Sequence, residues 1–234
     1  RRNFLCANEP AWLQVRPLPK RDALELTLAL PDQRQLQAIV ARVRRMFDLD
    51  ANPDVIESAL GQSPELKPLL QNSPGARSPG HWSLYESAVR AVVGQQVSTA
   101  AARGICARFA KACSSSDHLS FPSAAAIAAL PDAAFPMPGR RRDTLRALCG
   151  VFADSEHTVD LDTLGDLKGI GPWTLAMVAI RGAGEPDVFP KGDLGLERAW
   201  AAQGGDPKQL VQQAESWSPW RSYAANLLWR SLGP

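Results

Sequence analysis

The chain has 234 residues, of which 45% are hydrophobic and 21% are charged, and its formal net charge is +2. This composition is typical of a globular protein with a core of its own and excludes a disordered or fibrous chain. The small net charge also excludes a uniformly basic protein, so any surface that binds nucleic acid must be a local patch.

The cysteines are scattered and form no Cys-x-x-Cys pair: Cys6, Cys106, Cys113 and Cys149. Their spacing argues against structural zinc and a disulfide framework, so we expect no metal site, and free thiols are typical of a reducing cytoplasm. No apolar run is long enough to span a bilayer and no signal peptide is visible, so we expect no membrane partner.

Two short segments of mixed apolar and polar residues, 12–18 and 23–30, predict a strand pair joined by a turn at Pro19-Lys20-Arg21-Asp22. A helix is expected to begin at Pro31-Asp32, because apolar residues recur after it at helical spacing. Residues 71–80 are rich in glycine, proline and serine, which predicts a loop and a boundary. The predicted portions are therefore an N-terminal β/α portion, 1–75, and a helical core, 76–234.

The rest of the chain predicts a succession of helices, at 83–94, 98–113, 122–130, 140–153, 160–168, 172–182, 194–202, 207–217 and 220–232. The fold class is therefore mainly α, as an α+β chain with a short β start. The N-terminal segments carry the only predicted strands.

The segment Leu-Lys-Gly-Ile-Gly-Pro-Trp-Thr at 167–174 predicts a hairpin between two helices. We expect Gly169 and Gly171 to adopt backbone angles closed to other residues, and Pro172 to occupy the first position of the second helix. Free amides at a helix N-terminus beside glycines form an anion site, for which a DNA phosphate is one candidate. An ordinary corner between two helices predicts the same glycines, and the segment alone does not decide between the two.

Asp193 follows this hairpin in Asp-Val-Phe-Pro-Lys-Gly-Asp, directly before the predicted helix 194–202. From position alone a capping role is favoured, because Asp is a preferred helix N-cap. Asp187 is the competing acid in the same segment, and we expect it to be structural.

Together with Gly94-Gln-Gln-Val-Ser98 and Pro219-Trp-Arg-Ser-Tyr-Ala224, the hairpin resembles the helix–hairpin–helix DNA glycosylases, most closely the DNA-3-methyladenine glycosylase II (AlkA) type. The likeness extends from about Trp12 to Trp229. It implies a helical helix–hairpin–helix core beside an N-terminal antiparallel sheet. That N-terminal part is usually longer in the family, so whether 1–75 holds a complete sheet stays open.

The resemblance makes Asp193 the catalytic carboxylate, which stabilises positive charge on the sugar and orients or deprotonates water. Trp173 stands where bifunctional relatives place a lysine nucleophile, so it implies base removal without strand cleavage. Lys191 lies two residues before Asp193 and is the alternative source of an amine nucleophile. Most lysines are simply solvated on the surface, and we favour that role for Lys191.

The resemblance places Trp173 and Trp229 in the base pocket, where electron-rich rings attract a positively charged methylated purine. The alternative is that both are core residues. Met177 stands where the close family pattern has Tyr, which makes the pocket less aromatic and leaves its substrate range open.

For DNA binding, the resemblance implies phosphate contacts from Gly169 and Gly171, with help from Thr174 and an added contact from Lys168. Gln96 matches the side chain that fills the gap left by a flipped nucleotide; a polar cap between helices has equal weight. No cofactor is expected to be required, although carbonyls at 165–170 are candidates for a monovalent cation.

The implied function is a monofunctional repair enzyme that flips 3-methyladenine or 7-methylguanine from duplex DNA and hydrolyses the N-glycosidic bond. The expected partner is double-stranded DNA with alkylated bases, the expected state a monomer, and the expected location the bacterial cytoplasm or a eukaryotic nucleus. Two alternatives remain: a non-catalytic module that recognises distorted DNA, and a glycosylase for deaminated or etheno bases.

Overall fold

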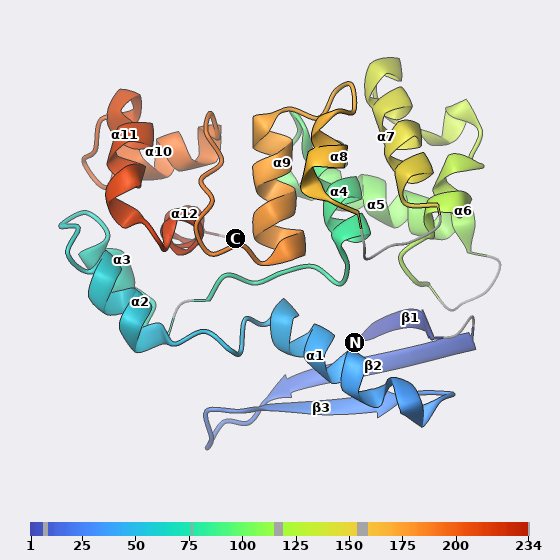
Figure 1. Cartoon of the computed structure of the whole chain (residues 1–234), viewed down its shortest axis with the longest axis horizontal. Coiled ribbons are helices and arrows are strands. Elements are labelled where there is room, and N and C mark those ends of the chain that lie inside the picture. The colour runs from blue at the N-terminus through green and yellow to red at the C-terminus, as the bar shows by residue number, and fades with distance from the viewer. Residues whose placement is uncertain (7–8, 76, 115–118, 154–158, 234) are drawn as a thin grey trace.

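The computed structural model describes residues 1–6, 9–75, 77–114, 119–153 and 159–233. Its buried apolar side chains form three clusters: one in an N-terminal sheet and helix, and one in each of two helical lobes. Figure 1 shows the two lobes side by side, with the sheet below them. This arrangement confirms the predicted mainly α fold class with a small antiparallel sheet.

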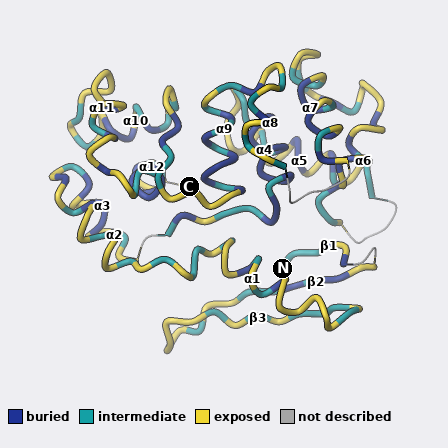
Figure 2. Tube along the Cα trace, viewed as in Figure 1, coloured by how far each residue is buried: buried dark blue, intermediate teal, exposed yellow. Residues whose placement is uncertain are grey.

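The sheet has three antiparallel strands in the order β1 (Arg2–Cys6), β2 (Glu9–Pro17) and β3 (Leu24–Ala29). Alternate side chains face inward, among them Phe4, Cys6, Ala11 and Leu13. Figure 2 shows the central strand β2 as more buried than the outer strand β3. The predicted strands correspond to β2 and β3, whereas β1 was not predicted, because five residues are too few to establish an alternation.

The helix that follows β3 packs against this sheet (Figure 1). Asp32 caps a short 3-10 turn at Gln33–Gln35, and α1 (Leu36–Met46) then presents Ile39 and Val43 to the strands. Trp82, from the segment before α4 (Leu84–Gly94), joins the same cluster. The sheet therefore packs against the beginning of the helical part.

Two helices were not predicted: α2 (Pro53–Leu60) and α3 (Lys67–Asn72). They span 8 and 6 residues, too short to display a clear helical periodicity. Their buried side chains belong to the cluster of the C-terminal helices. The boundary at residue 75 stays a prediction, and Ala76 lies outside the described residues.

The first lobe consists of α4 (Leu84–Gly94), α5 (Thr99–Cys113), α6 (Ala124–Ala128), α7 (Gly139–Val151), α8 (Leu161–Gly165) and α9 (Pro172–Val178). A π-helical turn, Ala179–Ala183, extends α9. The second lobe combines α2 and α3 with α10 (Leu194–Ala202), α11 (Leu210–Ala214) and α12 (Arg221–Ser231).

The predicted helices are confirmed within a few residues, except that 207–217 is divided by 3-10 turns on both sides of α11. In the described part of the chain, no helix is long and apolar enough to cross a membrane.

Candidate active site

Asp193 is the N-cap of α10, at the edge of the second lobe. Its Oδ1 accepts a hydrogen bond of 2.8 Å from the backbone N–H of Leu196. The capping role favoured by position alone is therefore confirmed. Since the cap holds the side chain half-exposed at the end of a helix, it also fixes where the carboxylate points.

Two indole N–H groups donate to this carboxylate, one from each lobe. Trp173 Nε1, on α9, donates to Asp193 Oδ2 over 2.8 Å. Trp229 Nε1, on α12, donates to Oδ1 over 3.1 Å. Both tryptophans are half-buried, so neither is a fully buried core residue. The structure thus brings the predicted acid and the two predicted pocket rings together where the lobes meet.

Gly195 is a contributor to this site that the sequence did not single out. A Cβ at this position would lie 2.9 Å from Asp193 Oδ1 and 3.6 Å from Trp229 Nε1. The absence of a side chain therefore lets the indole reach the carboxylate. The sequence feature that could have identified Gly195 is its position inside a predicted helix, two residues after the predicted catalytic acid.

Met177 follows Trp173 by one turn of α9 and is half-buried against the apolar cluster of the first lobe. A pocket of about 420 Å³ adjoins Trp229 on the second lobe. Its wall includes Arg181, which follows Met177 by four residues in the π-helical turn.

The two hairpin glycines differ in backbone conformation. Gly169 has φ +93°, and a Cβ there would lie only 2.2 Å from Thr144 Oγ1, so glycine is required. Gly171 has φ −100° and ψ 177°, which any residue can adopt, and nothing lies within 4 Å of its would-be Cβ. The prediction of glycine-only angles is therefore wrong for Gly171. It is the N-cap of α9, a position with ordinary extended angles.

Gln95 secures the hairpin, although the sequence pointed instead to its neighbour Gln96. The Gln95 Nε2 group donates to Gly169 O over 2.9 Å and to Thr174 Oγ1 over 3.0 Å. Thr174 is only 2% exposed, so its hydroxyl faces the first lobe rather than solvent. Its predicted help in holding a phosphate is corrected accordingly: the side chain positions the hairpin from inside.

Lys168 and Gln96 lie on the surface. Lys168 is exposed, and its carbonyl accepts a hydrogen bond of 2.9 Å from Thr144 Oγ1. Gln96 is exposed in the turn between α4 and α5, with φ +57°. The N-cap of α5 is Ser98, so the capping role offered as an alternative for Gln96 belongs to Ser98.

The competing acid, Asp187, has a structural environment. Arg221 Nε donates to its Oδ1 over 2.8 Å, and Ser218 Oγ donates to its Oδ2 over 2.8 Å. These bonds, the one from Arg221 foremost, lower the pKa of Asp187. Lys191 is exposed on the loop before Asp193.

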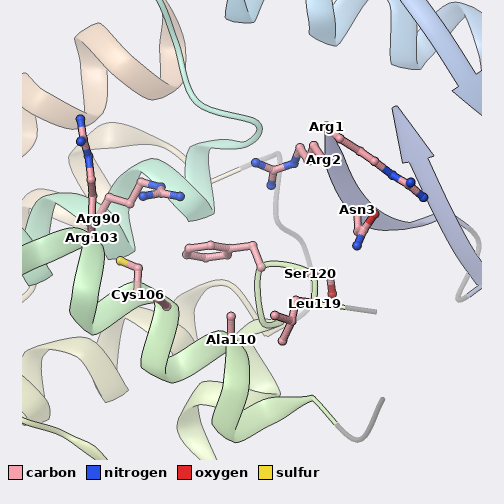
Figure 3. Close-up of a pocket in the computed structure, with 11 residues that line it drawn as sticks. Arg1, Arg2, Asn3, Arg90, Arg103, Cys106, Ala110, Leu119 and Ser120 are labelled. Carbon is pink, nitrogen blue, oxygen red and sulfur yellow. The ribbon is translucent and has the colours of Figure 1, made fainter. Parts of the chain in front are cut away.

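A larger cavity, of about 990 Å³, lies between β1 and α5. Figure 3 shows Arg1 and Arg2 on its strand side and Arg90 and Arg103 on its helical side. Arg2 and Arg90 both form ion pairs with the buried Glu86. None of the predicted site residues lines this cavity.

The chain is similar to several known proteins. Residues 1–83 match the AlkA N-terminal domain family. The chain is 38% identical, over 92% of its length, to a Mycobacterium tuberculosis protein named probable bifunctional transcriptional activator/DNA repair enzyme AlkA. It spans only 47% of that relative, about half its length.

The chain is also 32% identical to DNA-3-methyladenine glycosylase 2 of Escherichia coli, over 91% of this chain and 78% of that protein. Among solved structures, a 3-methyladenine DNA glycosylase from Archaeoglobus fulgidus superposes with a TM-score of 0.83. That superposition covers 98% of this chain and 85% of the other at 19% identity, and it supports the fold alone.

Proposed function

Because the chain belongs to the DNA-3-methyladenine glycosylase 2 (AlkA) family, we propose that it excises alkylated purines, such as 3-methyladenine and 7-methylguanine, from double-stranded DNA. The two relatives are named as a DNA repair enzyme and a DNA glycosylase. The observation that carries the proposal is the Asp193 carboxylate held between the indoles of Trp173 and Trp229.

The chemistry follows from this arrangement. When the bond between the base and C1′ breaks, positive charge develops on the sugar, and a carboxylate fixed nearby stabilises it. Water then adds to C1′ and gives up a proton. A methylated purine cation leaves as a neutral base, so its departure needs no proton donor. Flat rings beside the carboxylate suit stacking of a flipped base.

The proposed reaction stops at the abasic site. A lyase step needs an amine that attacks C1′, and Trp173 has no amine to offer. Lys191 is exposed on a loop, without the desolvated surroundings that make a lysine nucleophilic at neutral pH. Base release without strand cleavage is the expected outcome.

The hairpin and the turn before α5 form the proposed DNA-binding surface. Gly169 and Lys168 are exposed there, and Gly171 has open space beside its Cα. Gln96 is exposed in a left-handed turn, which supports the proposal that its side chain fills the gap left by a flipped nucleotide. We expect a monomer that acts where the DNA is, in a bacterial cytoplasm or a nucleus.

A monovalent cation at the hairpin remains part of the proposal. Two carbonyls of the segment 165–170 already accept side-chain hydrogen bonds, Lys168 from Thr144 and Gly169 from Gln95. A cation would therefore be held by the other carbonyls of the segment, where it would add positive charge facing a phosphate.

The decisive experiment replaces Asp193 with Asn. The side-chain oxygen of Asn still caps α10. Its NH₂ group, however, faces one of the N–H groups that donate to the Asp193 carboxylate in the wild type. We expect duplex binding within about threefold of wild type and a loss of base release of about a hundredfold or more. Single-turnover release of 3-methyladenine and 7-methylguanine measures the rate.

Asp206→Asn is the matched control, because Asp206 also caps a turn, accepting a 3.0 Å bond from Lys208 N, but lies outside the site. It should retain full activity. Undiminished release by Asp193→Asn would remove Asp193 from the mechanism. A wild-type protein that binds damaged duplexes yet releases no base would instead identify a non-catalytic DNA-binding module.

A further inference from the structure

Arg181 is a charged residue beside the site that the proposed chemistry leaves without a role. Its guanidinium carbon lies 5.2 Å from the centre of the Trp229 ring, over one face of it. Its Nη1 donates to Pro79 O over 2.7 Å. The N–H group of this same indole donates to Asp193. Trp229 is therefore in contact with both a fixed positive charge and the proposed catalytic acid.

The backbone around Arg181 is also fixed. The residue lies in the π-helical turn Ala179–Ala183, a type of irregularity found frequently at functional sites. Its carbonyl accepts a 2.6 Å hydrogen bond from His81 N, which joins α9 to the segment before α4. One hydrogen bond at the guanidinium and one at the backbone carbonyl therefore hold Arg181 in place.

The pocket beside Trp229 is positively charged. Arg77, Arg181 and Arg230 line it together with Asn226, and no carboxylate is among the described residues of its wall. Arg77 Nη1 donates to two backbone carbonyls, of Asp48 and Ala51. Burial lowers the pKa of Arg181 to about 10, so the guanidinium remains charged at neutral pH.

We propose that Arg181 promotes departure of electrically neutral damaged bases, by placing a positive charge on the wall of the pocket beside Trp229 while Asp193 acts on the sugar. This inference rests on the proposed glycosylase function. It makes Arg181 a specificity-determining residue that acts through space and through the indole, without taking part in proton transfer.

The reason lies in how charge moves during the reaction. A neutral base such as hypoxanthine takes the electron pair of the glycosidic bond and develops negative charge, which a nearby cation stabilises. A base that enters the pocket beside Trp229 would lie close to the guanidinium, because Arg181 and Trp229 are part of the same wall. A cationic base becomes neutral as it leaves, so the same charge stabilises nothing on it and opposes its binding instead.

The test compares two lesions on one protein: duplexes with a single hypoxanthine or a single 7-methylguanine, under single-turnover conditions with saturating enzyme. Arg181→Met should lower the hypoxanthine rate by about tenfold, and the 7-methylguanine rate by less than about threefold. Arg181→Lys, which keeps a positive charge, should retain the wild-type ratio of the two rates. The apparent Kd for the 7-methylguanine duplex should be unchanged or lower in Arg181→Met.

The ratio of rates does not depend on the fraction of folded enzyme, so a partly unfolded variant still gives an answer. Arg108→Met, on the exposed side of α5, controls for loss of an arginine elsewhere. Equal losses on both lesions, or no change in the ratio, would overturn the inference and leave the proposed function intact. A wild-type enzyme that releases 7-methylguanine but no hypoxanthine would overturn it too, and release of neither base would refute both.

Discussion

At the scale of single residues, the two hairpin glycines have different tasks. Gly169 is constrained by the fold, because it has φ +93° and its would-be Cβ overlaps Thr144. Gly171 has an ordinary φ of −100° and borders open space, so its missing side chain matters only to an approaching molecule. Gly169 is therefore required for folding, whereas the missing side chain of Gly171 matters for binding.

We therefore expect opposite results from two alanine substitutions. Gly169→Ala should destabilise the fold by about 2 kcal/mol or more, from left-handed strain and the clash with Thr144. Gly171→Ala should leave the free energy of unfolding within about 0.5 kcal/mol. It should weaken binding to a duplex with an abasic-site analogue about fivefold, as expected for one lost phosphate contact of ~1 kcal/mol.

Thermal unfolding and fluorescence anisotropy measure the two effects. A Gly171→Ala variant that binds DNA as tightly as wild type would show that the phosphate does not approach this glycine. The sequence predicted both glycines at the hairpin but not this difference, because the constraint on Gly169 comes from Thr144, which lies 25 residues earlier in the chain.

At the scale of elements, Gln95 links the end of α4 to the hairpin. Its single side-chain amide contacts Gly169 O and Thr174 Oγ1, so the turn that carries Gln96 and the hairpin that would bind phosphate form one unit. The sequence identified the Gly94–Ser98 block but emphasised Gln96. Which of two adjacent glutamines faces the hairpin is decided by the C-cap geometry of α4.

Gln95→Met keeps the length of the side chain but removes the donor. We expect about tenfold weaker duplex binding, since two hydrogen bonds of ~1 kcal/mol each are affected, with the rate of base release at saturating enzyme within about threefold of wild type. Gln95→Glu should bind more weakly still, because its carboxylate faces two oxygens. Gln212→Met, on the exposed surface of α11, is the matched control. A lower release rate with unchanged affinity would contradict this positioning role.

At the scale of the whole molecule, the sequence predicted the succession of helices and, by resemblance, the catalytic acid and its two tryptophans. It did not predict β1, α2 or α3, whose short lengths carry weak patterns, nor the contact between Arg181 and Trp229, which joins different lobes. These are features that only tertiary packing determines.

The same packing predicts which fragments can fold. Five side chains of α2, α3 and the segment between them complete the core of the second lobe: Ile56, Leu60, Leu66, Leu69 and Leu70. Each buried side chain of this size contributes about 2 kcal/mol, so removing all five costs on the order of 10 kcal/mol, as much as a typical domain's whole stability. A fragment of residues 76–234 should therefore lack a folded second lobe.

A fragment of residues 51–234 retains these helices and loses mainly the sheet and α1. We expect it to keep a cooperative urea transition and the near-ultraviolet signal of Trp200 and Trp217, which pack against each other at 5.4 Å between ring centres. The shorter fragment should lack this signal, and its urea transition should have a lower midpoint, since only the first lobe retains its core. Equal transition midpoints for the two fragments would mean that α2 and α3 contribute little to the lobe that holds Asp193 and Trp229, and that this half of the site is stable without them.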